Sequence, residues 1–381
     1  MTEFAGKRAT VVAIVVLAAL SALGIGCWVA QVASGAHLLN LTNYDMWGIY
    51  LAAFTVATGI AAGSLAFAGA ACLVPACASW FPYARIAAFA GGVGGTVMAG
   101  LFIMADLGAP WRSWEIIAML HPGSPLFWDT VVLSAFLVAS IALVVKLGRV
   151  KTPSDKGIKA LAVIALIAGA CVVITSFVFV FQVAKPSWNN PGQAVSFVFV
   201  AIFAAAAFLT LVIAACARCG LVENDAAALR RLGVAGALAA AGELVFALSE
   251  IAMGAFAGAG EHAAVAMWLI GGPGAPFFWT EIVALVAAVA LWLVGKNTPG
   301  RLLASAAALV ASLLVKYNLL QAQLFNPLID YAGFGQYSGL IEGAYFPSLI
   351  EWGVCIGIVA IAGLLCTVGF AKLGLARTDS K

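Results

Sequence analysis

Charged residues are scarce in this chain. Only 9% of its 381 residues are Asp, Glu, Lys or Arg, whereas 64% are hydrophobic; an ordinary soluble domain carries roughly 25% charged residues. This composition excludes a soluble globular protein. The segments between the apolar runs are also too short for a separate catalytic domain, because domains usually need at least ~50 residues. Any chemistry must therefore occur inside or at the surface of a membrane-embedded bundle.

Histidine is rare as well. The three histidines are His37, His121 and His262, and all lie between the apolar runs. Haem of the b type inside a bilayer needs paired histidines within the spans, so we expect no haem, and the Cys and His spacings contain no metal-binding motif. The eight cysteines lie in or beside the apolar runs, where they are interpreted as small apolar packing residues. The pair Cys216 and Cys219 alone is a weak redox signal.

Long apolar runs are abundant. Each covers about 20 residues, which is enough to cross ~30 Å of hydrocarbon as a helix. The sequence therefore predicts an all-α, polytopic membrane protein with ten transmembrane helices, at residues 10–31, 47–75, 84–106, 126–147, 158–184, 194–217, 229–254, 277–295, 301–325 and 348–371.

The basic residues predict the orientation of these helices. If the N-terminus is cytoplasmic, every Lys and Arg except Arg112, Lys185 and Lys316 falls in a cytoplasmic segment or helix end, as the positive-inside rule requires. This predicts that both termini lie in the cytoplasm. Most acidic residues lie in extracytoplasmic segments or within the spans. The net charge of +3 is thus a topology signal and does not indicate nucleic-acid binding.

Two similar motifs suggest an internal repeat. Ser124-Pro-Leu-Phe-Trp128, followed by Asp129, begins the fourth predicted helix, and Ala275-Pro-Phe-Phe-Trp279, followed by Glu281, begins the eighth. A shift of four helices preserves direction, so we predict two parallel-repeat four-helix bundles plus two extra helices; a chance match between short motifs is the alternative. The expected division is an anchor helix, a first bundle, a second bundle, and an outer docking loop with the C-terminal helix, at residues 1–31, 32–184, 185–325 and 326–381.

Ionisable residues inside the predicted spans are candidates for function, because a charge in the bilayer costs several kcal/mol unless it faces a cavity or a partner. Glu243 and Lys316 each lie about 20 Å along their helices from the cytoplasmic end. One interpretation is a buried ion pair between these two residues. The other is a proton path in the second bundle, with the candidate residues Glu243, Glu250, Glu281, Lys316 and Glu351.

Several motifs, taken in order, resemble one known family. Trp47-Gly-Ile-Tyr50, Asp106-Leu-Gly-Ala-Pro110, Ser124-Pro-Leu-Phe-Trp128 and Tyr345-Phe-Pro-Ser-Leu-Ile-Glu351 resemble the NrfD/PsrC family, the membrane subunits of polysulfide reductase-like molybdoenzymes. Gly242-Glu-Leu-Val-Phe246, Phe278-Trp-Thr-Glu281 and Phe325-Asn-Pro327 look most like its ten-helix branch, which includes the membrane subunit of a quinone-linked nickel–iron hydrogenase. The resemblance covers nearly the whole chain and implies a multi-pass protein of the bacterial cytoplasmic membrane.

The resemblance implies a quinone, menaquinone or ubiquinone, bound near the outer face of the first bundle. It also implies an extracytoplasmic four-cluster iron–sulfur subunit and a catalytic subunit of the molybdopterin type, a hydrogenase or a multihaem cytochrome. The positions carried over as quinone-binding are Tyr50, Asp106, Arg112, His121, Ser124, Trp128 and Asp129. An aromatic belt at the membrane surface is the alternative for Trp47, Tyr50, Trp111, Trp114, Trp128, Trp279 and Tyr345. Phe54 stands where the polysulfide reductase example has a histidine.

The main hypothesis is therefore a quinone-reactive membrane subunit of a respiratory oxidoreductase, without a catalytic cofactor of its own. The docking surface is expected on the outer loops near 107–125, 255–276 and 326–347, the last carrying Asp330 and Glu342. Two alternatives remain. A secondary transporter is favoured by the repeat and the buried charges, and a non-catalytic anchor of the complex is favoured by Phe54.

Overall fold

The described structure is entirely helical. The computed structural model describes residues 2–42, 45–119, 121–150, 152–183, 185, 187–223, 225–295, 297–326, 344–372 and 374, and these ranges contain no β-strand. Ten helical segments are long and apolar enough to span a membrane, which confirms the predicted fold class. They are α1 (Thr2–Ser34), α2 (Ile49–Leu73), the segment Pro75–Asp106, α6 (Pro125–Leu147), α7 (Lys156–Ser176), α8 (Gly192–Arg218), α9 (Ala226–Ala257), α11 (Ala275–Val294), α12 (Thr298–Leu324) and α13 (Leu349–Lys372).

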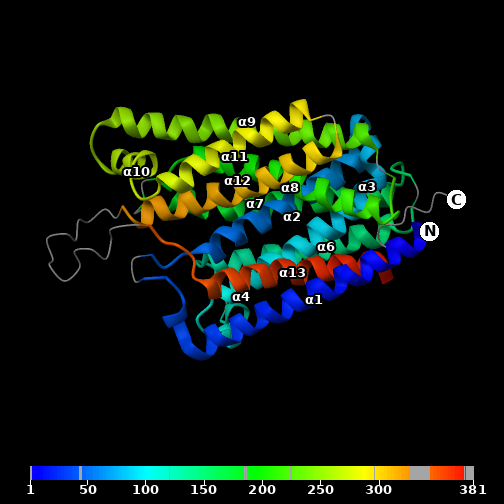
Figure 1. Cartoon of the computed structure of the whole chain (residues 1–381), viewed down its shortest axis with the longest axis horizontal. Helices are drawn as coiled ribbons and strands as arrows, with labels where there is room; N and C mark the ends of the chain where they lie inside the picture. The colour runs from blue at the N-terminus through cyan, green and yellow to red at the C-terminus, as the bar shows by residue number, and fades with distance from the viewer. Residues whose placement is uncertain are drawn as a thin grey trace.

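The helices run alongside one another in an elongated bundle (Figure 1). The first turns of α1 and the last turns of α13 lie at one end of it, and the short helix α10 (Glu261–Ile270) lies at the other. We call the end that carries α10 the outer end, following the charge distribution. The other short helices are η1 (Gly35–Leu38), η4 (Pro110–Arg112), α5 (Glu115–Ala118) and η5 (Phe177–Phe181).

The third span is built from four pieces. It passes through η2 (Pro75–Trp80), α3 (Phe81–Ile86), the π-helical stretch η3 (Ala87–Gly94) and α4 (Gly95–Asp106). A side chain at Gly91 would overlap Ser64 of α2, and one at Gly95 would press on Ala61 of the same helix. Gly63 faces the backbone of Ala201 on α8 just as closely. These glycines therefore allow close helix packing.

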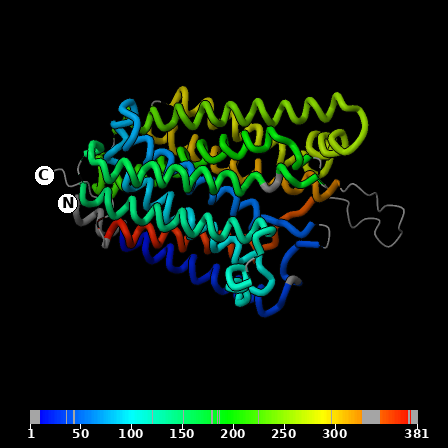
Figure 2. The backbone as a smooth tube through the Cα atoms, turned by 180° about the vertical axis from the view of Figure 1, so that it is seen from behind, coloured from blue at the N-terminus to red at the C-terminus, as the bar shows by residue number. Residues whose placement is uncertain are grey.

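Helix packing produces two groups joined by α2. The first group contains α2, α4, α6 and α7, and the second contains α8, α9, α11 and α12. Helix α2 also packs against α8 and α12, so it lies at the interface between the groups. The terminal helices α1 and α13 run side by side in opposite directions, and α13 also packs against α4 (Figure 2). We refer to the two groups as the first and second bundles; their independence as domains stays a prediction.

The two Pro-x-Phe-Trp motifs have the same local structure. Each proline stands in the first turn of its helix, α6 or α11, where its missing N–H costs no helical hydrogen bond. In each motif the tryptophan indole N–H donates to a carbonyl of the preceding loop, from Trp128 to Pro122 at 2.8 Å and from Trp279 to Ile270 at 3.0 Å. The neighbouring phenylalanine lies edge-on to its tryptophan in both cases. The motif therefore fixes how each helix begins.

Candidate functional site

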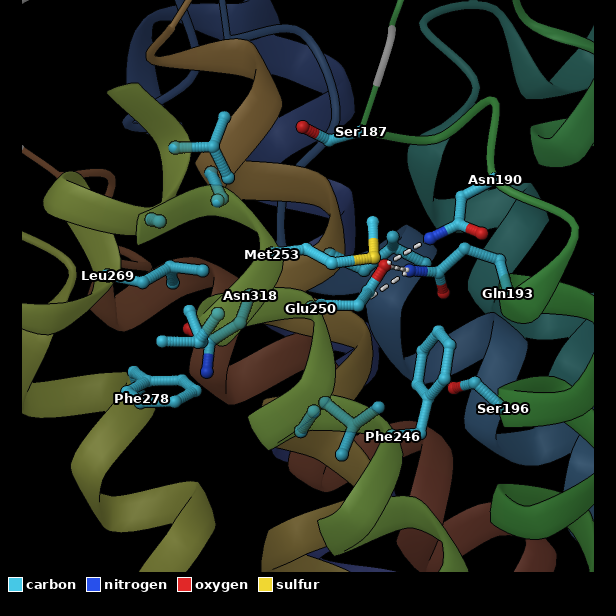
Figure 3. Close-up of a pocket in the computed structure, with 18 of the residues that line it drawn as sticks. Ser187, Asn190, Gln193, Ser196, Phe246, Glu250, Met253, Leu269, Phe278 and Asn318 are labelled. Atoms are coloured by element: carbon cyan, nitrogen blue, oxygen red, sulfur yellow. Dashed lines mark hydrogen bonds between the residues drawn. The ribbon is translucent and has the colours of Figure 1, made fainter. Parts of the chain in front are cut away.

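A polar cavity of about 100 Å³ lies in the outer half of the second bundle. Its walls come from α8, α9, α10, α11 and α12 and include three acids, Glu243, Glu250 and Glu281. Figure 3 shows Glu250 pointing toward Asn190 and Gln193, whose side-chain amides donate to its carboxylate at 2.8 and 2.9 Å. We call this space the carboxylate cavity. It gathers three of the predicted proton-path residues around one volume.

The two deeper acids are held by neutral donors. The Ser196 hydroxyl donates to Glu243 at 2.7 Å, and the Asn318 amide donates to Glu281 at 2.7 Å. Glu243 is 1% exposed and Glu281 is 3% exposed. A buried carboxylate costs much less when it accepts hydrogen bonds. The sequence identified these acids, but their serine and amide donors carry no signal that single-sequence reasoning could have used.

Lys316 is the cation of this region, yet it does not face the cavity directly. It is 1% exposed, and within the described ranges no carboxylate oxygen lies within 4.0 Å of its ammonium nitrogen. Its Nζ instead lies 3.5 Å from the centre of the Phe197 ring, a cation–π contact. Lys316 still interacts electrostatically with Glu243, Glu250 and Glu281. The direct ion pair with Glu243, one of the two interpretations from the sequence, is therefore absent from the structure.

A second group of polar side chains lies at the outer end, between α2, α12 and α13. Glu351 accepts hydrogen bonds from the Tyr345 hydroxyl, from Ser348 N at 2.8 Å and from Asn40 N at 3.2 Å. The Tyr317 hydroxyl donates to the Tyr345 carbonyl. Tyr345 is 3% exposed, so the aromatic-belt interpretation is wrong for this residue. Both tyrosines and Glu351 are thus fixed by direct contacts.

Tyr50 extends this group toward α1 and α4. Its hydroxyl donates to Gln31 Oε1 at 2.7 Å, and the Gln31 amide donates to the Ala105 carbonyl at 2.9 Å. The next residue, Asp106, lies within electrostatic reach of both Tyr50 and Glu351. We call Asp45, Tyr50, Asp106, Tyr317, Tyr345 and Glu351 the outer cluster.

Asp45 is the member of the outer cluster that lies before the first turn of α2. It is 2% exposed, and burial raises the pKa of its carboxyl from 3.8 to about 7, against the opposing effect of the Gln321 amide. Burial and the neighbouring Glu351 likewise raise the pKa of the Tyr345 hydroxyl above its usual range. Asp45 can therefore gain or lose a proton near neutral pH. Sequence reasoning missed Asp45, Gln31 and Tyr317, although an acid just before an apolar run was a usable signal for Asp45.

An apolar groove of about 420 Å³ lies directly below the outer cluster. Helices α1, α2, α4, α8, α12 and α13 all contribute to its walls. On α2 the lining runs from Ile49 to Ile60, which corresponds to about 16 Å of helix, or roughly half of the hydrocarbon thickness. Tyr50 and Glu351 adjoin the lining residues Ile49 and Trp352 in the chain. The groove thus has an apolar body and a polar neighbourhood at its outer end.

The predicted quinone-binding residues separate into two places. Tyr50 and Asp106 lie in the outer cluster, and Glu351, predicted with the second-bundle acids, lies with them. The others lie along η4, the loop after it and the start of α6. Arg112 is exposed and pairs with Glu115 at 2.8 Å, His121 and Trp128 are exposed, Ser124 directly precedes α6, and Asp129 is half-buried near Thr175.

Metal-binding clusters are not found in the part of the chain that the structure describes. Across these residues, no group of three or more His, Cys, Asp or Glu side chains has the geometry to hold a metal ion. Asp330 and Glu342, expected on the docking loop, lie outside the described residues.

Comparison with known proteins gives a consistent answer. The family model described as "Polysulphide reductase, NrfD" matches residues 37–326. A protein of Halobacterium salinarum, assigned as the membrane subunit of a dimethyl sulfoxide reductase, is 24% identical over 95% of this chain and 91% of the relative. A selenate reductase subunit of Mesobacillus selenatarsenatis is 22% identical over 93% of this chain and 91% of the relative. With ten apolar helices and a family match over more than half of its length, this multi-pass membrane protein belongs to the NrfD polysulphide reductase family.

Proposed function

We propose that this chain is the quinone-reactive membrane subunit of a respiratory reductase complex. It would exchange electrons between a membrane quinone and an iron–sulfur subunit docked at the outer end, which in turn serves a catalytic subunit. Family membership and the two relatives named as reductase subunits support the role of a membrane subunit. The proposal covers either menaquinone or ubiquinone as the carrier.

The observation that carries the quinone assignment is the apolar groove with polar residues at its outer end. A quinone has an isoprenoid tail and a polar ring, and the groove offers an apolar body of about 420 Å³ beside Tyr50, Asp106 and Glu351. Apolar ligands favour largely preformed apolar pockets with a few convergent polar groups. The walls supplied by α1 and α13 lie outside the residues matched by the family model, 37–326. The terminal helices therefore complete the site in this chain.

The outer cluster is suited to handle the protons of this reaction. Oxidation of a quinol to a quinone releases two electrons and two protons, and reduction takes up the same number. Glu351 accepts from Tyr345, and Asp106 lies within electrostatic reach of Glu351, so two carboxyl groups adjoin the proposed ring position. Asp45, with a pKa of about 7, would pass protons on toward the outer surface. Tyr50, fixed by Gln31, would orient the ring.

Substitution of Glu351 tests this location. In the purified complex, Glu351→Gln should lower quinol-dependent turnover by about 10²-fold or more, because general acid–base groups contribute factors of this size. Activity of the catalytic partner with an artificial dye should stay intact. Glu223→Gln, an exposed acid in a loop at the opposite end, is the matched control. Unchanged quinol kinetics in Glu351→Gln would contradict the proposal.

A parallel pair of variants distinguishes the second possible location. Asp129→Asn and His121→Ala change predicted residues at and before the start of α6, neither of which belongs to the outer cluster. If these variants abolish quinol turnover while Glu351→Gln does not, the quinone binds at α6. If neither set changes turnover, the chain is a non-catalytic anchor.

The carboxylate cavity favours a second role, a proton path through the second bundle. Three acids and Lys316 interact across α9, α11 and α12, and Glu250 is held by Asn190 and Gln193, in and just before the first turn of α8. Intramembrane ionisable groups commonly form proton relays. Vesicles that contain the complex should lose quinol-driven acidification in Glu243→Gln with quinol turnover retained. Full proton coupling in this variant would remove the path, and solute transport by the chain without partners would favour the transporter alternative.

A further inference from the structure

Lys316 lines a second, much smaller cavity, and none of the three acids is among its lining residues. This space measures about 10 Å³ and is bounded by α2, α7, α8 and Lys316 of α12. Its polar lining consists of Lys316 and three hydroxyl residues, Thr55, Thr58 and Ser176. Lys316 is absent from the lining of the carboxylate cavity. The ammonium group is therefore directed toward the interface between the two bundles.

The ammonium group of Lys316 lacks hydrogen-bond acceptors among the described residues. In the part of the chain that the structure describes, Lys316 Nζ is fully buried and has no hydrogen-bond partner. An ammonium carries three donors, and a buried donor that stays unpaired is costly. The Phe197 ring attracts the charge but accepts no conventional hydrogen bond. An acceptor in the small cavity would remove this cost.

The hydroxyl groups that line the cavity offer acceptor oxygens and have no free proton to donate. Thr55 donates to the Ala52 carbonyl at 2.7 Å, Thr58 donates to the Thr55 carbonyl at 2.9 Å, and Ser176 donates to Val172 at 3.1 Å. Each hydroxyl proton is thus used within its own helix, and only oxygen lone pairs remain available. An anion without a proton would have nothing to donate to these hydroxyl oxygens, so it would face only their lone pairs. A ligand that accepts from the lysine and donates to the hydroxyls fits both sides.

We propose that one water molecule occupies this cavity and bridges Lys316 to the hydroxyl oxygens of the first bundle. A volume of about 10 Å³ is the lower limit for one water, which also needs two to four polar partners. The water accepts from the ammonium and donates to two of the three hydroxyls. It makes Lys316 the hydrogen-bonded link between the second bundle and α2 and α7, and it supplies the acceptor that the buried cation lacks. The assignment does not depend on the quinone proposal.

A high-resolution density map of the complete complex tests the site directly. The wild type should show one solvent peak within about 2.7–3.2 Å of Lys316 Nζ. The double variant Thr55→Val and Thr58→Val, which keeps side-chain shape but removes two acceptors, should lose the peak. Thr210→Val is the matched control, because Thr210 is equally buried and donates within α8 but does not line the cavity. It should keep the peak.

Several outcomes would overturn the assignment. No peak in the wild type, or a peak that persists in the double variant, would contradict it. An anomalous peak at this position after exchange of chloride for bromide in a crystal would identify an anion instead. If the double variant fails to assemble, thermal unfolding of Lys316→Met, Thr58→Val and their combination replaces it. A bridging water predicts that the two midpoint losses are non-additive, and strict additivity would contradict the bridge.

Discussion

The carboxylate cavity and the apolar groove differ in where their acidic side chains lie. In the cavity, acids line the walls, and serine and amide groups donate to them, with about 100 Å³ of space. In the groove, about 420 Å³ is enclosed by apolar side chains, and the acids adjoin only its outer end. The first arrangement excludes lipid and suits protons or water, whereas the second admits an apolar chain. The described structure thus holds two chemically different environments.

Removal of the lysine should have the largest effect and tests the cavity side of this comparison. Lys316→Met keeps the length of the side chain but leaves three buried acids without their cation. Breaking such a buried charge arrangement typically costs about 3–5 kcal/mol, so we expect a loss of this size in the free energy of unfolding at neutral pH. Lys159→Met, at an exposed position of α7, is the control and should change little. Equal losses in both variants would show that the acids do not need the lysine.

The pH dependence of stability tests the outer cluster. The ordinary pKa of an Asp carboxyl is 3.8, and in the folded state the pKa of Asp45 is about 7. The folded state therefore binds the Asp45 proton more tightly than the unfolded state does. Stability from Asp45 is therefore present below about pH 4 and is lost as pH rises to about 7. The difference corresponds to about 4 kcal/mol. Asp45→Asn should remove this part of the pH dependence in thermal unfolding, and an unchanged pH profile would show that Asp45 ionises normally.

Partial filling of the groove tests whether an isoprenoid chain lies in it. Ala53→Leu adds apolar volume to a half-buried lining position of α2. We expect KM for quinol to rise about tenfold, equivalent to about 1.4 kcal/mol, with little change in dye activity. Ala235→Leu, at a position of similar exposure on α9, should leave KM unchanged. A KM for Ala53→Leu equal to that of the wild type would argue against an occupied groove.

The smallest effect is expected outside both sites. Arg112 is exposed and pairs with Glu115 three residues later. Such surface pairs contribute little because solvent screens them, so Arg112→Ala should leave the unfolding midpoint within error of the wild type. Quinol kinetics should be unchanged as well, since Arg112 is exposed and pairs with Glu115, which is not part of the outer cluster. Loss of quinol turnover in the same complex would support the original prediction that Arg112 contributes to the quinone site.

The sequence predicted the fold, and three of the acids that it singled out lie around one cavity, whose function stays a prediction. Ten apolar runs correspond to ten helices, because backbone groups in lipid must bond within their own segment. The sequence singled out Glu243, Glu250 and Glu281 because a charge inside the membrane is costly unless it has a partner or a cavity. In the structure, all three line one cavity. The Glu243–Lys316 ion pair was one of two interpretations, and it is wrong because side-chain direction, which spacing does not reveal, sends Lys316 toward Phe197.

What the sequence determined by itself was membership of a membrane fold, the number of spans and the identity of the costly residues, since these depend on composition and local length. Tertiary structure alone decided which of those residues meet. Glu351 joins Tyr50 and Tyr345 instead of the second-bundle acids, and the groove exists because α1 and α13, far apart in the chain, pack together. Such contacts depend on how distant helices pack across the interior, and no local pattern in the chain encodes that arrangement.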